Sequence, residues 1–271
     1  MLNKILSLSI LTFLEGVRDR AIFGIGLFAL AMMSVTLVVL GFFMRELDKV
    51  AVDINLSAIS LAGLLLTFFL SINLMAKDID KRTIYCVMSK PFSRAQYIWA
   101  KFIGILFIIL TALAVLTFFS SLTIVIAKMQ YANWFKAFSW IEYFKAVYAS
   151  FLMFVVLNAF VIFFSSITSS SFLTLLFSIG TYIAGQTIEE VVIYLKNVKG
   201  QETQISEFIQ KMIDILQYIL PNLSVFDLKV QASHGIHLPL DYLCGITAYA
   251  SIYSGILMVA ASLIFSRREL S

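Results

Sequence analysis

Long apolar runs without a single charged residue are the feature that most restricts what this chain can fold into. They cover residues 21–44, 54–76, 102–127, 146–188 and 242–266. Each is long enough for a helix that crosses a bilayer, which needs roughly 20 residues. Only helices and closed barrels satisfy their backbones in lipid, and barrel strands would show short alternating segments instead of continuous runs. The sequence therefore predicts an all-α membrane protein.

The composition agrees with a chain that lies mostly in lipid. Hydrophobic residues make up 61% and charged residues 13% of the sequence, against roughly 45 to 50% and 25% in soluble domains. The run 146–188 is far longer than one span requires. Serine and threonine cluster at its centre, in residues 165–171, where a polar turn would divide it. We therefore expect six transmembrane helices.

Basic residues between the second and third expected spans predict how the chain is oriented. This loop contains Lys77, Lys81, Arg82, Lys90, Arg94 and Lys101. Lysine and arginine accumulate in short cytoplasmic loops, so we expect this loop and, with six spans, both termini to be cytoplasmic. Anionic lipid head groups account for the net charge of +4. The net positive charge therefore requires no nucleic-acid partner to explain it.

Two segments lie outside the expected spans. Apolar side chains from Leu2 to Val17 share one helical face, which predicts an interfacial helix along the cytoplasmic surface. A second apolar stripe predicts an external helix that ends before Pro221. The expected organisation is an interfacial helix (1–20), five spans (21–188) with a cytoplasmic segment (77–97), an external helical segment (189–241), and a sixth span with a cytoplasmic tail (242–271).

The sequence lacks the residues that catalysis or self-powered transport would require. No glycine precedes a lysine, so the phosphate-binding loop G-x-x-x-x-G-K-[ST] is absent. The expected spans contain no Asp, Glu, Lys or Arg, the groups that couple ion-driven transporters to a gradient. Because no nucleophile–base pair or complete metal-ligand set is visible, we predict no catalytic residue, no directly bound cofactor and no metal site.

Some polar residues leave two interpretations open. His234 and His237 could bind a metal outside the membrane, or could be loop histidines beside a turn-forming glycine and proline. Asn73, Asn158 and Gln186 could line a substrate path, or could hydrogen-bond between helices, which is the commoner role of such residues in membranes. The residue types alone favour the structural role in both cases.

The charged segment 77–97 is ordered in a way that a solvated loop would not need. Asp78 and Asp80 come first, where a helix N-terminus favours acidic residues, and residues 83–88 are compatible with a helix. Pro91 then requires a turn before the next span. Charge alone is also consistent with a plain cytoplasmic loop, but this order favours a short helix on the membrane surface.

The same residues resemble a pattern found in ABC-2 type permeases. The strings K-D-I-D-K-R-T, M-S-K-P-F-S-R and K-F-I-G are similar to the acidic turn, threonine, "sKPisR" and "Kflg" that lead from the second span to the third in that family. Residues 12–20, T-F-L-E-G-V-R-D-R, are similar to its "T-x-x-E-x-x-R-d-r/k" elbow helix. Arg82 replaces the glycine that usually precedes the threonine, so the shape of this turn departs from the family pattern.

The resemblance implies a type V exporter-like permease subunit with six spans, an elbow helix and an external helical segment. Such a subunit would pair with a second permease subunit, expected to be identical, and would bind ATP-binding subunits that hold ATP and magnesium. The chain itself would not be an enzyme. The expected location is the bacterial inner (plasma) membrane. The resemblance places the following residues at the docking surface for the ATP-binding subunit: Glu15, Arg18, Lys77, Asp78, Asp80, Lys81, Arg82, Thr83, Ser166 and Ser169.

Two functions are consistent with this resemblance. The first is export of a substrate, driven by ATP hydrolysis in the separate subunit. The second is mechanotransmission, in which the subunit acts on an external protein partner without moving a solute. In both, the segment 77–97 would be a coupling helix that passes motion to the second and third spans.

Overall fold

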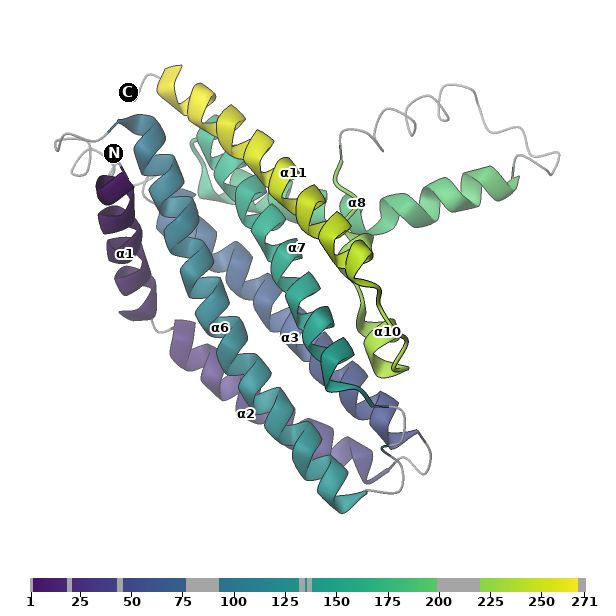
Figure 1. Ribbon diagram of the computed structural model, residues 1–271. Coiled ribbons are helices and arrows are strands. Elements are labelled where there is room, and N and C mark those ends of the chain that lie inside the picture. Colours follow the sequence, from purple (N-terminus) through teal and green to yellow (C-terminus); the bar gives the residue numbers. More distant parts are fainter. Residues whose placement is uncertain are drawn as a thin grey trace.

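The chain folds into a bundle of long helices (Figure 1). The computed structural model describes residues 2–18, 21–42, 46–76, 93–131, 135, 138–198 and 220–267. Its elements are α1 (Leu2–Arg18), α2 (Ala21–Leu40), α3 (Leu47–Ser71), η1 (Ile72–Ala76), α6 (Arg94–Gln130), α7 (Trp140–Ile167), α8 (Ser171–Val198), η3 (Ser224–Phe226), α10 (Lys229–Ser233) and α11 (Leu240–Arg267). Within these described ranges there is no strand, which confirms the all-α prediction.

Five helices are long and apolar enough to cross a membrane, by length and composition. They are Leu47–Met75, Arg94–Gln130, Trp140–Ile167, Ser171–Tyr194 and Leu240–Arg267. The first of the six expected spans corresponds to α2, a helix of 20 residues whose apolar stretch Gly24–Leu40 is shorter than the other five. The chain is therefore a multi-pass membrane protein. Figure 1 places the start of α1 and the end of α11 at the same end of the bundle.

The polar cluster that was expected to divide the fourth apolar run does divide it. α7 ends at Ile167, and Thr168 then adopts an extended backbone conformation. The hydroxyl groups of Thr168 and Thr174 hydrogen-bond across the turn at 2.8 Å, and α8 begins at Ser171. Hydroxyl side chains favour such a break because they compensate the backbone groups that a helix end leaves without partners.

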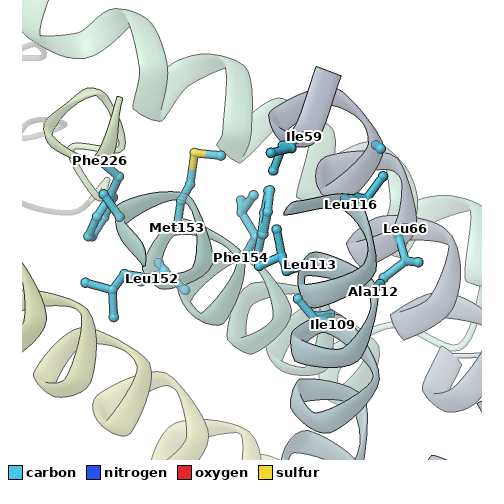
Figure 2. Packing of buried hydrophobic residues seen from close by; sticks show 14 of the residues in the cluster. Ile59, Leu66, Ile109, Ala112, Leu113, Leu116, Leu152, Met153, Phe154 and Phe226 are labelled. Carbon is cyan, nitrogen blue, oxygen red and sulfur yellow. The ribbon is translucent and has the colours of Figure 1, made fainter. Parts of the chain in front are cut away.

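α7 lies at the centre of the bundle and packs against α3, α6, α8 and α11. Figure 2 shows Phe154 of α7 among side chains from α3 and α6, including Ile59 and Leu113. All three are buried. Lipid tails are as apolar as these side chains, so close van der Waals packing, and not exclusion of water, holds such helices together.

Asn158 of α7 joins three helices within this core. Its side chain is fully buried, and its Oδ1 accepts a hydrogen bond from the hydroxyl of Ser71 on α3 at 2.8 Å. Its Nδ2 donates to the carbonyl of Phe102 on α6 at 3.3 Å. Of the two interpretations of this residue, hydrogen bonding between helices is the one that the structure shows.

We expect Asn158→Leu to lower the free energy of unfolding by about 0.6 kcal/mol, and by no more than about 1.7 kcal/mol, the range for hydrogen bonds between membrane helices. The measurement is unfolding of the purified protein in mixed micelles. Thr111→Val is the control, because the hydroxyl of Thr111 is exposed and bonds only within its own helix, to Phe107. Equal effects of the two substitutions would show that the contacts of Asn158 contribute nothing specific.

Residues 220–239 fold back onto the bundle. The amide of Leu223 donates to the carbonyl of Gly185 on α8 at 2.9 Å, and the amide of Asn222 donates to the hydroxyl of Tyr249 on α11 at 2.9 Å. The side chains of Leu223 and Phe226 are buried. These contacts attach the segment to two of the candidate spans.

α8 extends further than the sequence indicated. It continues to Val198, beyond residue 188, where the apolar run ends, and Figure 1 shows its last turns projecting from the bundle. The carboxylate of Glu189 accepts a hydrogen bond from the side chain of Asn222 at 3.1 Å and another from the hydroxyl of Ser224. The charged residues after 188 therefore continue the helix. The external helix expected before Pro221 lies outside the described residues.

Candidate functional site

α1 is the helix at the position expected for the elbow helix, and it packs lengthwise against α6. The hydroxyl of Ser9 donates to the carbonyl of Ala100 at 3.0 Å. Gly104 lies directly opposite Thr12, so close that a Cβ at this glycine would be 2.7 Å from the Cβ of Thr12 and 2.9 Å from the carbonyl oxygen of Ser9. These small and polar residues allow close approach of the two helices, and Leu8, Ile5 and Phe13 of α1 add apolar contacts with the core.

Several apolar side chains of α1 are left uncovered by the described part of the chain. Leu6, Ile10, Leu11 and Leu14 are all exposed. The hydrophobic periodicity predicted this helix, and it made no prediction of the side that contacts the bundle. An apolar outer face on a helix of this kind suits contact with lipid.

Glu15 is held in place by a lysine of α6. Its Oε2 lies 3.6 Å from the Nζ of Lys101, whose side chain is only 5% exposed. The same Nζ lies 5.8 Å from the centre of the Tyr97 ring, a distance at which a cation is attracted to an aromatic face. The carboxylate of Glu15 is 54% exposed and Arg18 is exposed, so both remain accessible to a partner.

α1 reaches the base of the charged segment. Gly16 faces Ile108 of α6 and Leu74 of η1, and η1 ends at Ala76, the last described residue before the segment 77–92. η1 also packs against α7 and α8. The predicted docking residues Lys77, Asp78, Asp80, Lys81, Arg82 and Thr83 lie outside the described residues.

The two predicted docking serines differ in accessibility. Ser166 is fully buried at the end of α7, and its hydroxyl donates to the carbonyl of Ile162 at 2.9 Å. Ser169 is exposed in the turn between α7 and α8. Of this pair, the structure offers the side chain of Ser169 to a partner.

Arg94 has a role that sequence reasoning did not identify. It follows Ser93, whose hydroxyl accepts from the amide of Gln96 while the Gln96 side chain accepts from the amide of Ser93, a capping box at the start of α6. Nη1 of Arg94 donates to the carbonyls of Phe265 and Ser266 at the end of α11, at 3.4 and 3.2 Å. A cation is favourable at a helix C-terminus, so this contact links the start of α6 to the end of α11.

The two histidines have non-metal partners. Nδ1 of His237 lies 3.2 Å from Oε1 of Glu142, and Nδ1 of His234 lies 2.9 Å from the carbonyl oxygen of Val230. Among the residues that the structure describes, no group of three or more His, Cys, Asp or Glu side chains could hold a metal ion.

The other polar residues singled out within the spans lie at cavities. Asn73 lines an apolar cavity of about 250 Å³ between α2 and α3. Gln186 lines a more polar cavity of about 230 Å³ between α3, α7, α8 and the segment 220–239. Unlike Asn158, these two residues border space that a small molecule could occupy.

The sequence matches a known family along nearly its whole length. The family described as ABC-2 family transporter protein matches residues 6–269. This range includes the five candidate spans, α2, most of α1 and the segment 220–239. Comparison with curated proteins gives no match.

Proposed function

This chain belongs to the ABC-2 family of transporter proteins, and from this premise we propose that it couples ATP hydrolysis in a separate subunit to export of a substrate. Family membership makes it a permease component of an ABC transporter, working with an ATP-binding partner in a lipid bilayer. Export as the direction of transport, the coupling to ATP hydrolysis and the identity of the docking residues go beyond family membership and are proposed here.

The observation that carries the coupling proposal is the convergence of elements around η1. α1 contacts η1 through Gly16, α7 and α8 pack on it, and the segment 77–92 leaves from its last residue. A partner bound to that segment would therefore act on several helices at once. The chain has no phosphate-binding loop of its own, so the energy would come from that partner.

We expect the double substitution Asp78→Lys, Arg82→Glu to reduce co-purification with the cognate ATP-binding subunit to background, because charge reversal at an interface places like charges together. The measurement is affinity purification from cells that express both subunits. Glu46→Lys, Lys49→Glu is the matched control, because it reverses an exposed ion pair at the opposite end of the bundle and should leave co-purification unchanged. Retention of the subunit by the first variant would refute the docking assignment.

A second candidate function is mechanotransmission to an external partner. It is favoured by the hydrogen bonds that attach residues 220–239 to α8 and α11, since motion of these helices would reach the segment. A fluorophore at the exposed position Ile236 should then change its emission during ATP hydrolysis in proteoliposomes that contain no substrate. Constant emission under these conditions would eliminate this alternative.

We further propose that two copies of the chain form the membrane part of the complex. α8 and α11 each have only 28% of their most apolar window buried within one copy, which leaves apolar surface for a second subunit as well as for lipid. Native mass spectrometry from detergent should give twice the 30.5 kDa of the chain. A species containing only one copy would contradict the homodimer.

A further inference from the structure

A small polar cavity lies beneath the segment 220–239. Its volume is about 230 Å³, and the space occupied by one water in the liquid is about 30 Å³, so it has room for a ligand about the size of a small amino acid. Its polar walls come from four parts of the chain: Ser60 of α3, Ser150 of α7, Tyr182 and Gln186 of α8, and Asp227 and Lys229 of the overlying segment. The other two described cavities have mainly apolar linings.

One part of the wall has the chemistry that recognises an ammonium group. The rings of Phe226 and Tyr182 line the cavity together with the carboxylate of Asp227. Aromatic faces attract cations, and a carboxylate accepts charge-assisted hydrogen bonds from them. The hydroxyl of Ser150 donates to its own helix, to Ala146 at 3.1 Å, and its lone pairs can accept from a ligand.

The remaining polar groups suit a carboxylate. Lys229 supplies a positive charge, and the side-chain amide of Gln186 supplies N–H donors. The Nε2 of Gln186 donates to the sulfur of Met153 at 3.4 Å. A thioether is a weak acceptor, so exchanging it for a carboxylate oxygen would strengthen the hydrogen bond.

The two charged groups are paired with each other, at a distance of 3.2 Å between Nζ of Lys229 and Oδ2 of Asp227, and their side chains are 26% and 40% exposed. Ion pairs that are this accessible to water contribute little to stability and open at small cost. A ligand that carries both charges can give Asp227 a new cationic partner and Lys229 a new anionic partner at the same time. A ligand with one charge would leave either Asp227 or Lys229 without a partner.

We propose that this cavity binds a small zwitterion of the α-amino acid class. Its ammonium group lies against Asp227, Phe226 and Tyr182, and its carboxylate lies against Lys229 and Gln186. The inference does not depend on the ATP-binding subunit, because every contributing residue belongs to this chain. It adds a ligand site under the segment 220–239.

The test is equilibrium binding of radiolabelled L-alanine to the purified full-length protein in detergent. We expect saturable binding, and competition by unlabelled alanine but not by propionate or ethylamine, each of which carries only one of the two charges. Asp227→Asn and Lys229→Gln should each weaken alanine binding by about tenfold, equivalent to about 1.4 kcal/mol. Glu46→Gln, in an exposed ion pair that does not line the cavity, should bind as the unchanged protein does.

Ser150→Leu provides an independent test of the site, because the larger side chain fills the cavity without changing Asp227 or Lys229. It should abolish binding while the variant still elutes as a monodisperse species. Absence of saturable alanine binding to the unchanged protein, equal competition by propionate or ethylamine, or undiminished binding by the Asp227 and Lys229 variants would each overturn the proposal. Since no ATP-binding subunit is present in this assay, such a failure leaves the proposed coupling function untouched.

Discussion

Replacing Glu142 with alanine is expected to lower the free energy of unfolding by about 3 kcal/mol, the lower end of the range for breaking a buried ion pair. The Glu142 side chain is only 4% exposed, and its Oε1 lies 3.0 Å from Nζ of Lys145, which is 11% exposed. Its Oε2 accepts the amide of Leu238 at 3.1 Å. Without the carboxylate, Lys145 retains a buried charge whose remaining described partner is the carbonyl of Leu238, at 2.7 Å.

The loss of local stability in this variant should be largest where Leu238 contacts the start of α7. Amide hydrogen–deuterium exchange of residues 236–238 should accelerate together with the loss of global stability measured by thermal unfolding. Glu46→Ala is the control, because Glu46 also pairs with a lysine three residues later, Lys49, but its side chain is 66% exposed. The hydrogen bond and the charge of Lys49 lower the pKa of Glu46, yet solvent screening makes such a pair weak, so stability should hardly change. Similar losses for both variants would contradict the buried role of Glu142.

Gly104→Ala is expected to lower the free energy of unfolding by about 1–3 kcal/mol through overpacking. The added Cβ would lie 2.7 Å from the Cβ of Thr12 and 2.9 Å from the carbonyl oxygen of Ser9, and neither atom can move without moving the backbone of α1. The substitution should therefore separate α1 from α6. Thermal unfolding measures the loss, and faster proteolysis within residues 2–18 reports the separation.

The matched control is Gly26→Ala in α2, where an added Cβ would meet nothing within 4 Å. There the substitution changes only the helix propensity, which should raise the free energy of unfolding by about 0.5–1 kcal/mol. The two substitutions should therefore change the free energy of unfolding in opposite directions. Stabilisation by Gly104→Ala would mean that α1 does not approach α6 as closely as described.

Much of the fold could be predicted because lipid imposes simple rules on sequence. The apolar runs located the spans, and the hydroxyl cluster at 165–171 located the break between α7 and α8, since both depend on local composition. The end of α8 was missed because Glu189 finds its partners, Asn222 and Ser224, more than thirty residues away. A charge that is satisfied by a distant segment does not have to end a helix.

The candidate site was harder to predict because its contacts join distant parts of the chain. The packing face of α1 depends on Gly104 being opposite Thr12, which no periodicity within α1 can reveal. Arg94 is separated by 171 residues from the carbonyl of Phe265 that it contacts. The partners of Glu142 could not be predicted from the sequence either. Its position in the first turn of α7, where an acidic residue is favoured, was the one sequence feature that pointed to a role for it.

The most direct test of the coupling account is site-specific photo-cross-linking of this chain to its ATP-binding subunit. A cross-linking amino acid would replace one residue at a time at Thr83, Glu15, Ser169 and Leu240, and the last of these is exposed at the opposite end of the bundle. The account predicts a cross-linked product from position 83, with weaker products from 15 and 169, and none from 240. A product from position 240 together with none from position 83 would contradict it.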